Sequence, residues 1–228
     1  MAGTRKPSSL PKYGEACLRA LVEEGLADRV VLGGALGLLH YLDYRSTKDV
    51  DVWWSCEVGA EERQRVIRTV EATLKEYGSV DTRTWGDVVS IDLQEAEKTV
   101  FSFRIARRSA QLEPSGSAAW IAVPLDSLAD LVASKMTALV ERGAPRDFRD
   151  IHALCRAGLT DAEQCWALWE KRQELAGSDP DRQRGCLAIE THLARIAQHR
   201  PLAGITDSAQ RAEAEQVRTW FQEEIVRT

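Results

Sequence analysis

Hydrophobic and polar positions follow two different patterns along the chain, and the change comes near residue 124. Before it, short apolar runs and alternating runs typical of strands are interspersed with segments of helical periodicity. After it, almost every segment repeats its apolar positions with the period of an amphipathic helix. The chain is therefore predicted to be an α+β protein, with a mixed sheet flanked by helices in residues 1–124 and a helical bundle in residues 125–228.

The pattern predicts individual elements in both parts. In the first part we expect helices over residues 13–26, 35–42 and 60–77, and strands over residues 29–32, 49–54, 81–85, 88–94, 100–107 and 120–123. In the second part we expect helices over residues 125–142, 146–157, 184–198 and 208–226, and one more that opens at Thr160 with a capping box. The strands over 88–94 and 100–107 alternate cleanly, which is typical of a sheet with one packed face and one solvated face.

Composition and charge narrow the class of protein. The 228 residues are 44% hydrophobic, which is enough for a packed core. The net charge of −5 gives no general attraction for nucleic acid, so an RNA contact would need a local basic patch. The sequence contains neither an apolar run of membrane-spanning length nor a signal-peptide pattern in residues 1–12. Its five cysteines form no Cys-x-x-Cys pair, so we expect a cytoplasmic protein with small buried thiols.

Two glycines and two carboxylates form the most informative stretch. An apolar run ends at Gly33 and Gly34, a short amphipathic segment follows, and Asp49 and Asp51 then stand one residue apart in a strand. Residues i and i+2 of a strand share a face with Cα atoms roughly 6.5 Å apart, so the two carboxylates can bind a pair of divalent metals. Glycines at the start of a helix expose backbone N–H groups that can bind phosphate. Together these residues suggest a site for a metal–nucleotide complex.

A third carboxylate could complete this acidic face. Asp92 lies on the polar face of a strand that could pair beside Asp49 and Asp51, and Asp81 and Asp87 are the competing candidates. Carboxylates gathered on one surface repel each other unless a cation neutralises them. Mg²⁺ and Mn²⁺ are the ions whose preference for oxygen ligands fits such a set.

The order of these features is more specific than any one of them. A lone Asp-x-Asp is usually a solvated strand face, and a lone Gly-Gly is usually a turn. The sequence strand, Gly-Gly, helix, Asp-x-Asp and later acid resembles the nucleotidyltransferase superfamily. Residues 33–36 and 45–51 also resemble the first signature of the AbiEii/AbiGii-type toxin nucleotidyltransferases, G-G-x-A-L followed by R-x-S-x-D-I-D, with Thr47 in place of the serine.

A second signature lies in the helical part. Lys135 stands at the edge of an apolar stripe, and by itself it would be a side chain that reaches past that stripe to water. The spelling Lys-x-x-Ala-x-x-x-Arg, followed by Arg-Asp-x-x-Asp, resembles the second signature of the same toxin family. Its members here are Lys135, Ala138, Arg142, Arg146, Asp147 and Asp150. Both signatures together cover approximately residues 30–154 and leave the helices after Thr160 unassigned.

The resemblance implies a metal-dependent transfer of a nucleoside monophosphate from a nucleoside triphosphate. The catalytic residues it implies are Asp49, Asp51, Lys135 and Asp150, with Asp150 positioning either Lys135 or an arginine. The metal ligands it implies, for Mg²⁺ or Mn²⁺, are Asp49, Asp51 and Asp92. The nucleotide contacts it implies are Gly33, Gly34, Thr47, Lys135, Arg142 and Arg146. We expect Lys135→Ala to lose most activity without unfolding the protein.

The acceptor is not readable from the residues. The family implies RNA ends, notably the tRNA 3′ end, or protein side chains, and a toxin role implies a cognate antitoxin. Arg104, Arg107 and Arg108 form either a patch that follows phosphates or the solvated end of a strand. Two alternatives stay open: a nucleotidyltransferase that modifies a small molecule such as an antibiotic, and a non-catalytic binding or regulatory module with the same fold.

Overall fold

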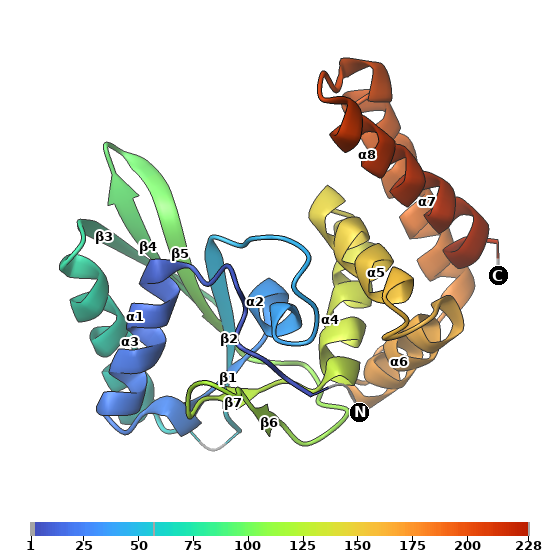
Figure 1. Cartoon of the computed structure of the whole chain (residues 1–228). Helices are drawn as coiled ribbons and strands as arrows, with labels where there is room; N and C mark the ends of the chain where they lie inside the picture. Colours follow the sequence, from blue (N-terminus) through green and yellow to red (C-terminus); the bar gives the residue numbers. More distant parts are fainter. Residues whose placement is uncertain (1–2, 57, 228) are drawn as a thin grey trace. The chain divides into compact units, whose positions relative to one another are not determined.

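The computed structural model describes residues 3–56 and 58–227 (Figure 1). Its contacts divide the described chain into two compact units. The first comprises the residues up to Ser109 together with Glu113–Leu131, and the second comprises Ala110–Leu112 and the residues from Val132 onward. The division falls after residue 131, later than the sequence-based boundary at 124, because residues 124 and 125 add a strand to the sheet.

Within the described residues, the first unit contains a mixed sheet with the strand order β3-β4-β5-β2-β1-β7-β6. The strands are β1 (Val30–Leu32), β2 (Asp49–Trp54), β3 (Ser79–Trp85), β4 (Val88–Glu95), β5 (Lys98–Ala106), β6 (Gly116–Ser117) and β7 (Pro124–Leu125). Strand β2 lies between β1, which is antiparallel to it, and β5, which is parallel. The α+β class predicted from the sequence is confirmed.

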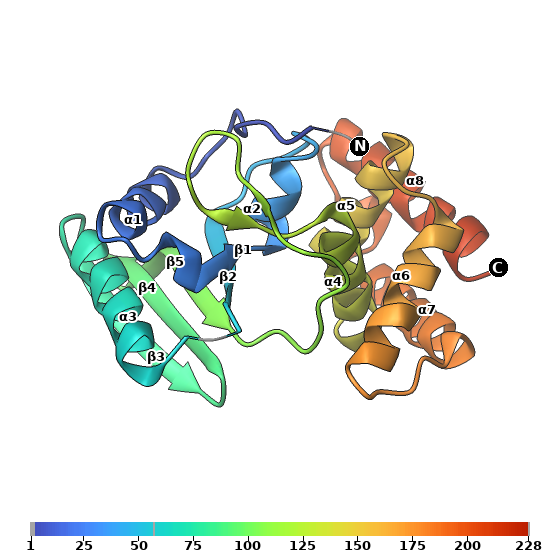
Figure 2. The same ribbon diagram turned by 90° about the horizontal axis from the view of Figure 1, so that it is seen from below.

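Helices cover the sheet unequally. The first unit contains α1 (Lys12–Glu23), η1 (Ala27–Arg29), α2 (Gly34–Leu39) and α3 (Ala60–Lys75). Helices α1 and α3 lie side by side on one face of the sheet (Figure 2). Their apolar residues share one buried cluster with alternate residues of β2, among them Leu18, Leu21, Val66, Val70, Val50 and Val52. Because side chains alternate along a strand, Asp49 and Asp51 are placed on the opposite face of β2.

The second unit is helical, as the sequence predicted. It contains most of α4 (Leu128–Glu141), followed by α5 (Pro145–Arg156), α6 (Ala162–Leu175), α7 (Arg182–His199), η2 (Leu202–Gly204), α8 (Ser208–Trp220) and η3 (Phe221–Ile225). Large aromatic side chains fill its core. The rings of Phe148 and Phe221 pack edge to face with centroids 4.7 Å apart, and the indole of Trp166 donates a hydrogen bond to the carbonyl of Ile225 over 3.1 Å.

Two local predictions are wrong. Residues 120–122 form a turn and bends and residue 123 is irregular, so there is no strand over 120–123, and the Trp120 indole donates to His40 Nε2 over 2.9 Å. Thr160 does not cap the third helix of the second unit, because Asp161 does so and accepts a hydrogen bond from the backbone N–H of Gln164.

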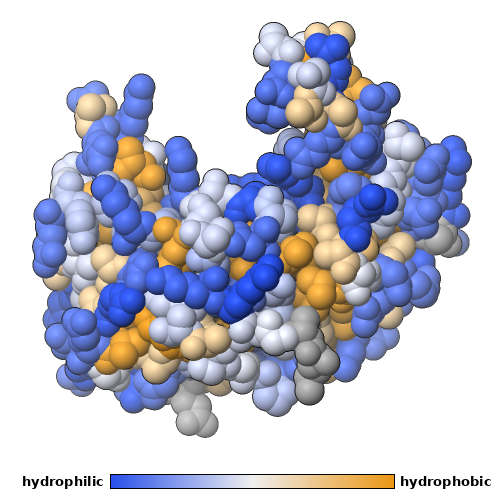
Figure 3. All heavy atoms as spheres, viewed as in Figure 1, coloured by the Kyte–Doolittle hydropathy of each residue, from blue (hydrophilic) through white to orange (hydrophobic). Residues whose placement is uncertain are grey.

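Hydrophilic side chains cover much of the face shown in Figure 3, and apolar residues appear on it in smaller patches. No helix among the described residues has the length and apolar character needed to cross a membrane. The five cysteines are free thiols, but only Cys17 and Cys165 are fully buried and Cys56 is exposed. The expectation that all five are buried is therefore wrong.

Candidate active site

The two predicted carboxylates of β2 lie on the face of the strand that α1 and α3 leave uncovered. The side chains of Asp49 and Asp51 are 26% and 37% exposed, whereas Val50 and Val52 between and after them are buried. Thr47 stands at the start of the strand, where its hydroxyl accepts a hydrogen bond from the backbone N–H of Asp49 over 3.3 Å. The alternation in residues 49–52 thus produces a strand with an apolar side in the core and an acidic side open to solvent.

The diglycine turn approaches this acidic side closely. Gly34 has φ +58°, and a Cβ atom at this position would lie 2.4 Å from Asp51 Oδ2. Any side chain here would be strained and would fill the space beside that carboxylate. Gly33 donates its N–H to the carbonyl of Asp51 over 2.9 Å, so this amide extends the pairing of β1 with β2. What the glycines provide at this point is room beside Asp51.

Trp53, the third residue on the acidic side of β2, turns toward the end of β7. Its indole donates to Asp126 Oδ2 over 2.8 Å, and Arg108 forms an ion pair with the other oxygen of Asp126. A Cβ atom on Gly33 would lie 2.5 Å from Trp53 Nε1, so the indole packs directly against the turn. Burial raises the pKa of Asp126 to about 6, against the opposing attraction of Arg108.

Sequence reasoning missed this contact between Asp126, Arg108 and Trp53. The three residues are far apart in sequence and no local spacing signals their contact. The structure also changes the interpretation of the basic patch around β5, because the Arg108 side chain is only 9% exposed and is committed to Asp126. Arg107 is exposed.

The structure places Asp92 away from the acid pair. Asp92 pairs in register with Ser102 of β5, which pairs in turn with Asp49 of β2, so two strand spacings, about 10 Å, separate the two aspartates. Asp92 is only 2% exposed, so the prediction of a solvated face is wrong at this position. Ser90 and Ser102 donate hydrogen bonds to its carboxylate, and Arg83 forms an ion pair with it.

These contacts keep Asp92 charged. Burial acts to raise the pKa of Asp92, but hydrogen bonds from Ser102 and Arg83 outweigh it and hold the pKa below its ordinary value. The competing candidates lie still further from β2. Asp81 is opposite Asp92 on the outer strand β3, with Arg83 Nε 3.4 Å away, and Asp87 is exposed in the turn before β4. In the part of the chain that is described, no group of three or more His, Cys, Asp or Glu side chains could hold a metal ion.

A cation of the neighbouring strand lies beside the two carboxylates of β2. Arg104 of β5 pairs in register with Asp51, and its Nη1 atom lies 3.7 Å from Asp49 Oδ2 and 3.9 Å from Asp51 Oδ1. Carboxylate oxygens are preferred ligands of Mg²⁺ and Mn²⁺, and the space kept by Gly34 lies beside one of them. Asp49 and Asp51 thus fit a divalent cation, whereas the set of three acids that includes Asp92 does not.

The second predicted signature forms a buried cluster inside the helical unit. Lys135 Nζ of α4 lies 2.9 Å from Asp147 Oδ1 and 2.8 Å from Asp150 Oδ2, both on α5. The two carboxylates are fully buried and the lysine side chain is 10% exposed. Asp150 thus contacts Lys135, one of the two partners that the sequence left open for it.

The two arginines of this signature are exposed. Arg142 reaches Asp147 Oδ2 from the end of α4 over 3.0 Å, and its side chain is 54% exposed. Arg146 lies in the first turn of α5, which Pro145 opens. The arginines therefore differ from Lys135, which is enclosed by the carboxylates that it binds.

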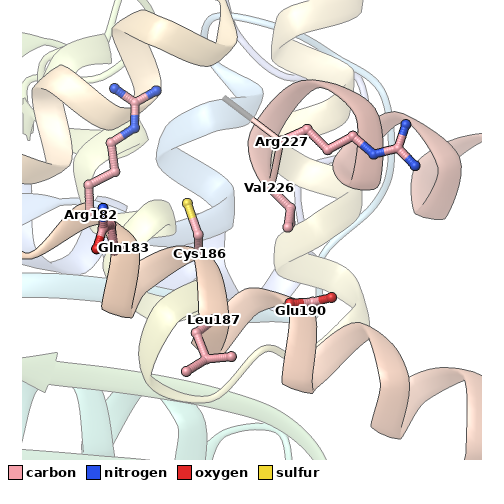
Figure 4. Close-up of a pocket in the computed structure, with 7 residues that line it drawn as sticks. All are labelled: Arg182, Gln183, Cys186, Leu187, Glu190, Val226 and Arg227. Carbon is pink, nitrogen blue, oxygen red and sulfur yellow. The ribbon is translucent and has the colours of Figure 1, made fainter.

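A surface hollow of about 540 Å³ lies elsewhere in the second unit (Figure 4). Its lining includes Arg182, Cys186, Leu187 and Glu190 of α7, together with Val226 near the end of the chain. Burial raises the pKa of the Cys186 thiol, which keeps it protonated near neutral pH. No residue predicted from the sequence as part of the site lines this hollow.

A mixed sheet with a diglycine turn packed against an Asp-x-Asp strand, followed by a helical unit, is the arrangement expected from the sequence for a nucleotidyltransferase. The chain matches the model of the family described as nucleotidyl transferase AbiEii toxin, type IV TA system, over residues 16–223. It therefore belongs to this family of toxin nucleotidyltransferases. The match confirms the resemblance stated from the two signatures and extends it to the helices after Thr160.

Comparison with solved structures supports the fold through one match and gives two weaker ones. A crystal structure described as a candidate nucleotidyltransferase from H. pylori matches with a TM-score of 0.51 and 14% identity over 92% of this chain and 95% of that one. ANT(2")-Ia in complex with adenylyl-2"-tobramycin matches at 0.48 and 14%, over 72% and 94%. An antigenic nucleotidyltransferase-like protein from Paracoccidioides brasiliensis matches at 0.38 and 14%, over 89% and 91%. Comparison with curated proteins gives no match.

Proposed function

We propose that this nucleotidyltransferase moves a nucleoside monophosphate from a nucleoside triphosphate to a macromolecular acceptor, breaking the bond between the α- and β-phosphates and releasing pyrophosphate, with Mg²⁺ or Mn²⁺ held by Asp49 and Asp51. The observation that carries the proposal is the placement of both carboxylates on the open face of β2, next to the room that Gly34 leaves beside Asp51. Asp92 is omitted from the proposed ligands, because two serines and an arginine already occupy its oxygens.

A divalent cation at this face would withdraw charge from the phosphate oxygens and make an acceptor hydroxyl easier to deprotonate. Asp49 and Asp51 would hold it and orient the triphosphate. Gly33 and Gly34 would let the phosphates approach the backbone closely, as the absence of side chains there allows. We propose that the Thr47 hydroxyl donates a hydrogen bond to a phosphate oxygen. The same hydroxyl accepts a hydrogen bond from the backbone N–H of Asp49 at the start of β2.

The second signature supports further roles. We keep Lys135 and Asp150 as proposed catalytic groups, and Arg142 and Arg146 as proposed nucleotide contacts. The contacts inside the helical unit support a lysine with a fixed position, since two carboxylates bind one ammonium at hydrogen-bonding distance. Asp147 would share with Asp150 the task of orienting Lys135.

For the acceptor we propose RNA, at the tRNA 3′ end, with a protein side chain as the second choice. Both acceptors follow from what the resemblance to the toxin family implies. Membership of a toxin family of type IV toxin–antitoxin systems supports a cognate antitoxin as a partner. The small-molecule alternative enters as an outcome of the test.

The test supplies the full chain with each nucleoside triphosphate in turn, labelled on the α-phosphate, and Mg²⁺. Separate reactions contain total tRNA, periodate-oxidised tRNA, a mixture of purified proteins, or an aminoglycoside. We expect label on intact tRNA and none on oxidised tRNA, whose 3′ hydroxyls are destroyed. A triphosphate labelled on the γ-phosphate should transfer nothing, which distinguishes nucleotidyl transfer from phosphoryl transfer.

Each other outcome changes the proposal in a defined way. Label on protein alone would replace RNA by a protein acceptor, and label on the aminoglycoside alone would replace the toxin reaction by antibiotic modification. Label on none of the acceptors, with every triphosphate tried, would favour a non-catalytic module that keeps the fold.

A further inference from the structure

The strand next to the acid pair carries a cation opposite Asp51. Strand β5 pairs with β2 so that Ser102 lies opposite Asp49 and Arg104 lies opposite Asp51. Paired residues on neighbouring strands present their side chains on the same face. The acidic side of β2 is therefore bordered by a hydroxyl and a guanidinium.

The contacts of Arg104 are loose compared with other ion pairs of the same sheet. Its Nη1 atom lies 3.7 Å and 3.9 Å from the two carboxylates, beyond the range of a charge-assisted hydrogen bond, and its side chain is 37% exposed. Arg83, two strands away, instead binds the buried carboxylate of Asp92 at short range. Arg104 thus attracts both Asp49 and Asp51 without being fixed to either.

We propose that Arg104 has two successive partners: the Asp49–Asp51 pair in the metal-free protein, and a phosphate group of the nucleoside triphosphate once a divalent cation binds that pair. The inference rests on the proposed function, since it requires the cation at Asp49 and Asp51. Two reasons favour it. A guanidinium and a divalent cation repel each other, so they cannot both neutralise the same carboxylates at close range. The planar fork of arginine also fits phosphate oxygens in a bidentate contact.

The neighbouring carboxylate Asp92 does not compete for Arg104 during this change of partner. Asp92, on the same face, is balanced by Arg83 and by hydrogen bonds from Ser90 and Ser102, so it is already neutralised before a substrate arrives. When a cation binds Asp49 and Asp51, phosphate becomes the anion that Arg104 can bind on this face. The expected consequence is that Arg104 opposes binding of the metal alone and favours binding of the metal with nucleotide.

The test measures two dissociation constants by electron paramagnetic resonance. The first is for Mn²⁺ alone, and the second is for the complex of Mn²⁺ with a non-hydrolysable triphosphate analogue. We expect Arg104→Gln to bind Mn²⁺ alone about threefold more tightly, the scale of a solvent-exposed ion pair. The same variant should bind the Mn²⁺–analogue complex about tenfold more weakly, the scale of a lost hydrogen bond to a charged group. Both constants of Arg104→Lys should fall between those of the wild type and of Arg104→Gln, because lysine keeps the positive charge but loses the planar guanidinium group.

Arg107→Gln is the matched control, since it removes the same charge from an exposed position just after β5. It should change neither constant by more than about 1.5-fold, the smallest effect expected for an exposed charge. If Arg104→Gln leaves both constants unchanged, or moves both in the same direction, the inference is overturned. Circular dichroism and the melting temperature confirm that each variant is folded.

Asp51→Asn separates this failure from a failure of the proposed function. If Asp51→Asn loses Mn²⁺ binding and Arg104→Gln behaves like the wild type, the metal site stands and only the role of Arg104 falls. If Asp51→Asn binds Mn²⁺ as the wild type does, the carboxylate pair is not the metal site, and both proposals fall together.

Discussion

Aspartates and cations are combined in two ways in this protein. On the acidic side of β2, Arg104 lies 3.7 Å and 3.9 Å from two carboxylates that are 26% and 37% exposed. In the helical unit, Lys135 lies 2.8 Å and 2.9 Å from two carboxylates that are fully buried. The residue types are alike, but the first group is partly exposed with Arg104 beyond hydrogen-bonding distance, while the second is buried with Lys135 at hydrogen-bonding distance.

The difference follows from the cost of desolvation. Buried carboxylates need a partner at short range, because an uncompensated charge in the interior costs several kcal/mol. Exposed carboxylates are partly satisfied by water, so they can exchange one cation for another at small cost. The open pair therefore has the properties of a binding site, and the closed cluster stabilises the helical unit while it holds Lys135, a proposed catalytic group, in one position.

Removing Lys135 should break the closed cluster and give the largest effect on stability. Lys135→Met would leave Asp147 and Asp150 buried without their ammonium, and we expect a loss of about 3–5 kcal/mol in the free energy of unfolding, measured with urea. The contacts thus change the expectation drawn from the sequence, that Lys135→Ala would lose activity without unfolding.

A compensated variant checks the cause. Lys135→Met combined with Asp147→Asn and Asp150→Asn removes the charges together and should recover part of the lost stability. If Lys135→Met alone unfolds at the same urea concentration as the wild type, the cluster does not support the helical unit.

The pH dependence of stability should show the titration of Asp126, the buried carboxylate that accepts a hydrogen bond from Trp53 beside the acid pair. Asp126 binds its proton more tightly in the folded protein, where burial raises its pKa to about 6, than in the unfolded chain, where the value is about 4. Its contribution to stability is therefore present below about pH 4 and is lost as the pH rises toward 6. Two pKa units correspond to about 2–3 kcal/mol.

Asp126→Asn should remove this contribution. The difference in unfolding free energy between wild type and variant, followed by urea titration from pH 4 to pH 7, should change by about 2 kcal/mol in favour of the variant at the higher pH. A difference that stays constant across this range would mean that the pKa of Asp126 is not raised.

Gly34→Ala should damage the open side at its closest approach. An L side chain at φ +58° costs about 1–2 kcal/mol, and the added Cβ would also press against Asp51 Oδ2. Gly25→Ala is a matched control, because Gly25 has φ +66° and its Cβ would meet no atom within 4 Å. We expect similar backbone strain in both variants, and a loss of nucleotidyl transfer in Gly34→Ala alone. Equal activity in the two variants would contradict a role for the space beside Asp51.

Arg142→Ala should have the smallest effect on the free energy of unfolding. Arg142 is the exposed partner of Asp147, which keeps Lys135 in the variant, so we expect a loss of less than about 1 kcal/mol in unfolding free energy. A loss as large as that of Lys135→Met would show that the exposed arginine, not the buried lysine, neutralises the cluster.

The sequence predicted what local pattern determines. Residues 49–54 form a strand with the predicted bounds, because the alternation of polar and apolar residues there decides both the element and its faces. The surroundings of Asp92, the predicted third acid, depend instead on contacts with neighbouring strands. Asp92 has the right local pattern, but its burial and its three partners come from β3 and β5 as well as its own strand.

Long-range contacts explain the other omissions. Asp126, Arg108 and Trp53 meet because β7 pairs with β1, and a two-residue strand leaves almost no periodic signal. The double pairing of Lys135 was likewise beyond a single-helix pattern, since that pattern gives an edge position but not which residues of α5 face it.

One measurement tests the central claim, that Asp49 and Asp51 carry the reaction, most directly. Asp51→Asn and Asp92→Asn change the same chemical group on the same face of one sheet, and single-turnover transfer of α-labelled nucleotide can be compared in both after each is shown to be folded. We predict that Asp51→Asn lowers the rate by about a thousandfold or more, the scale of lost transition-state electrostatics, and that Asp92→Asn retains transfer within about tenfold of the wild type. Wild-type transfer by Asp51→Asn would contradict the account.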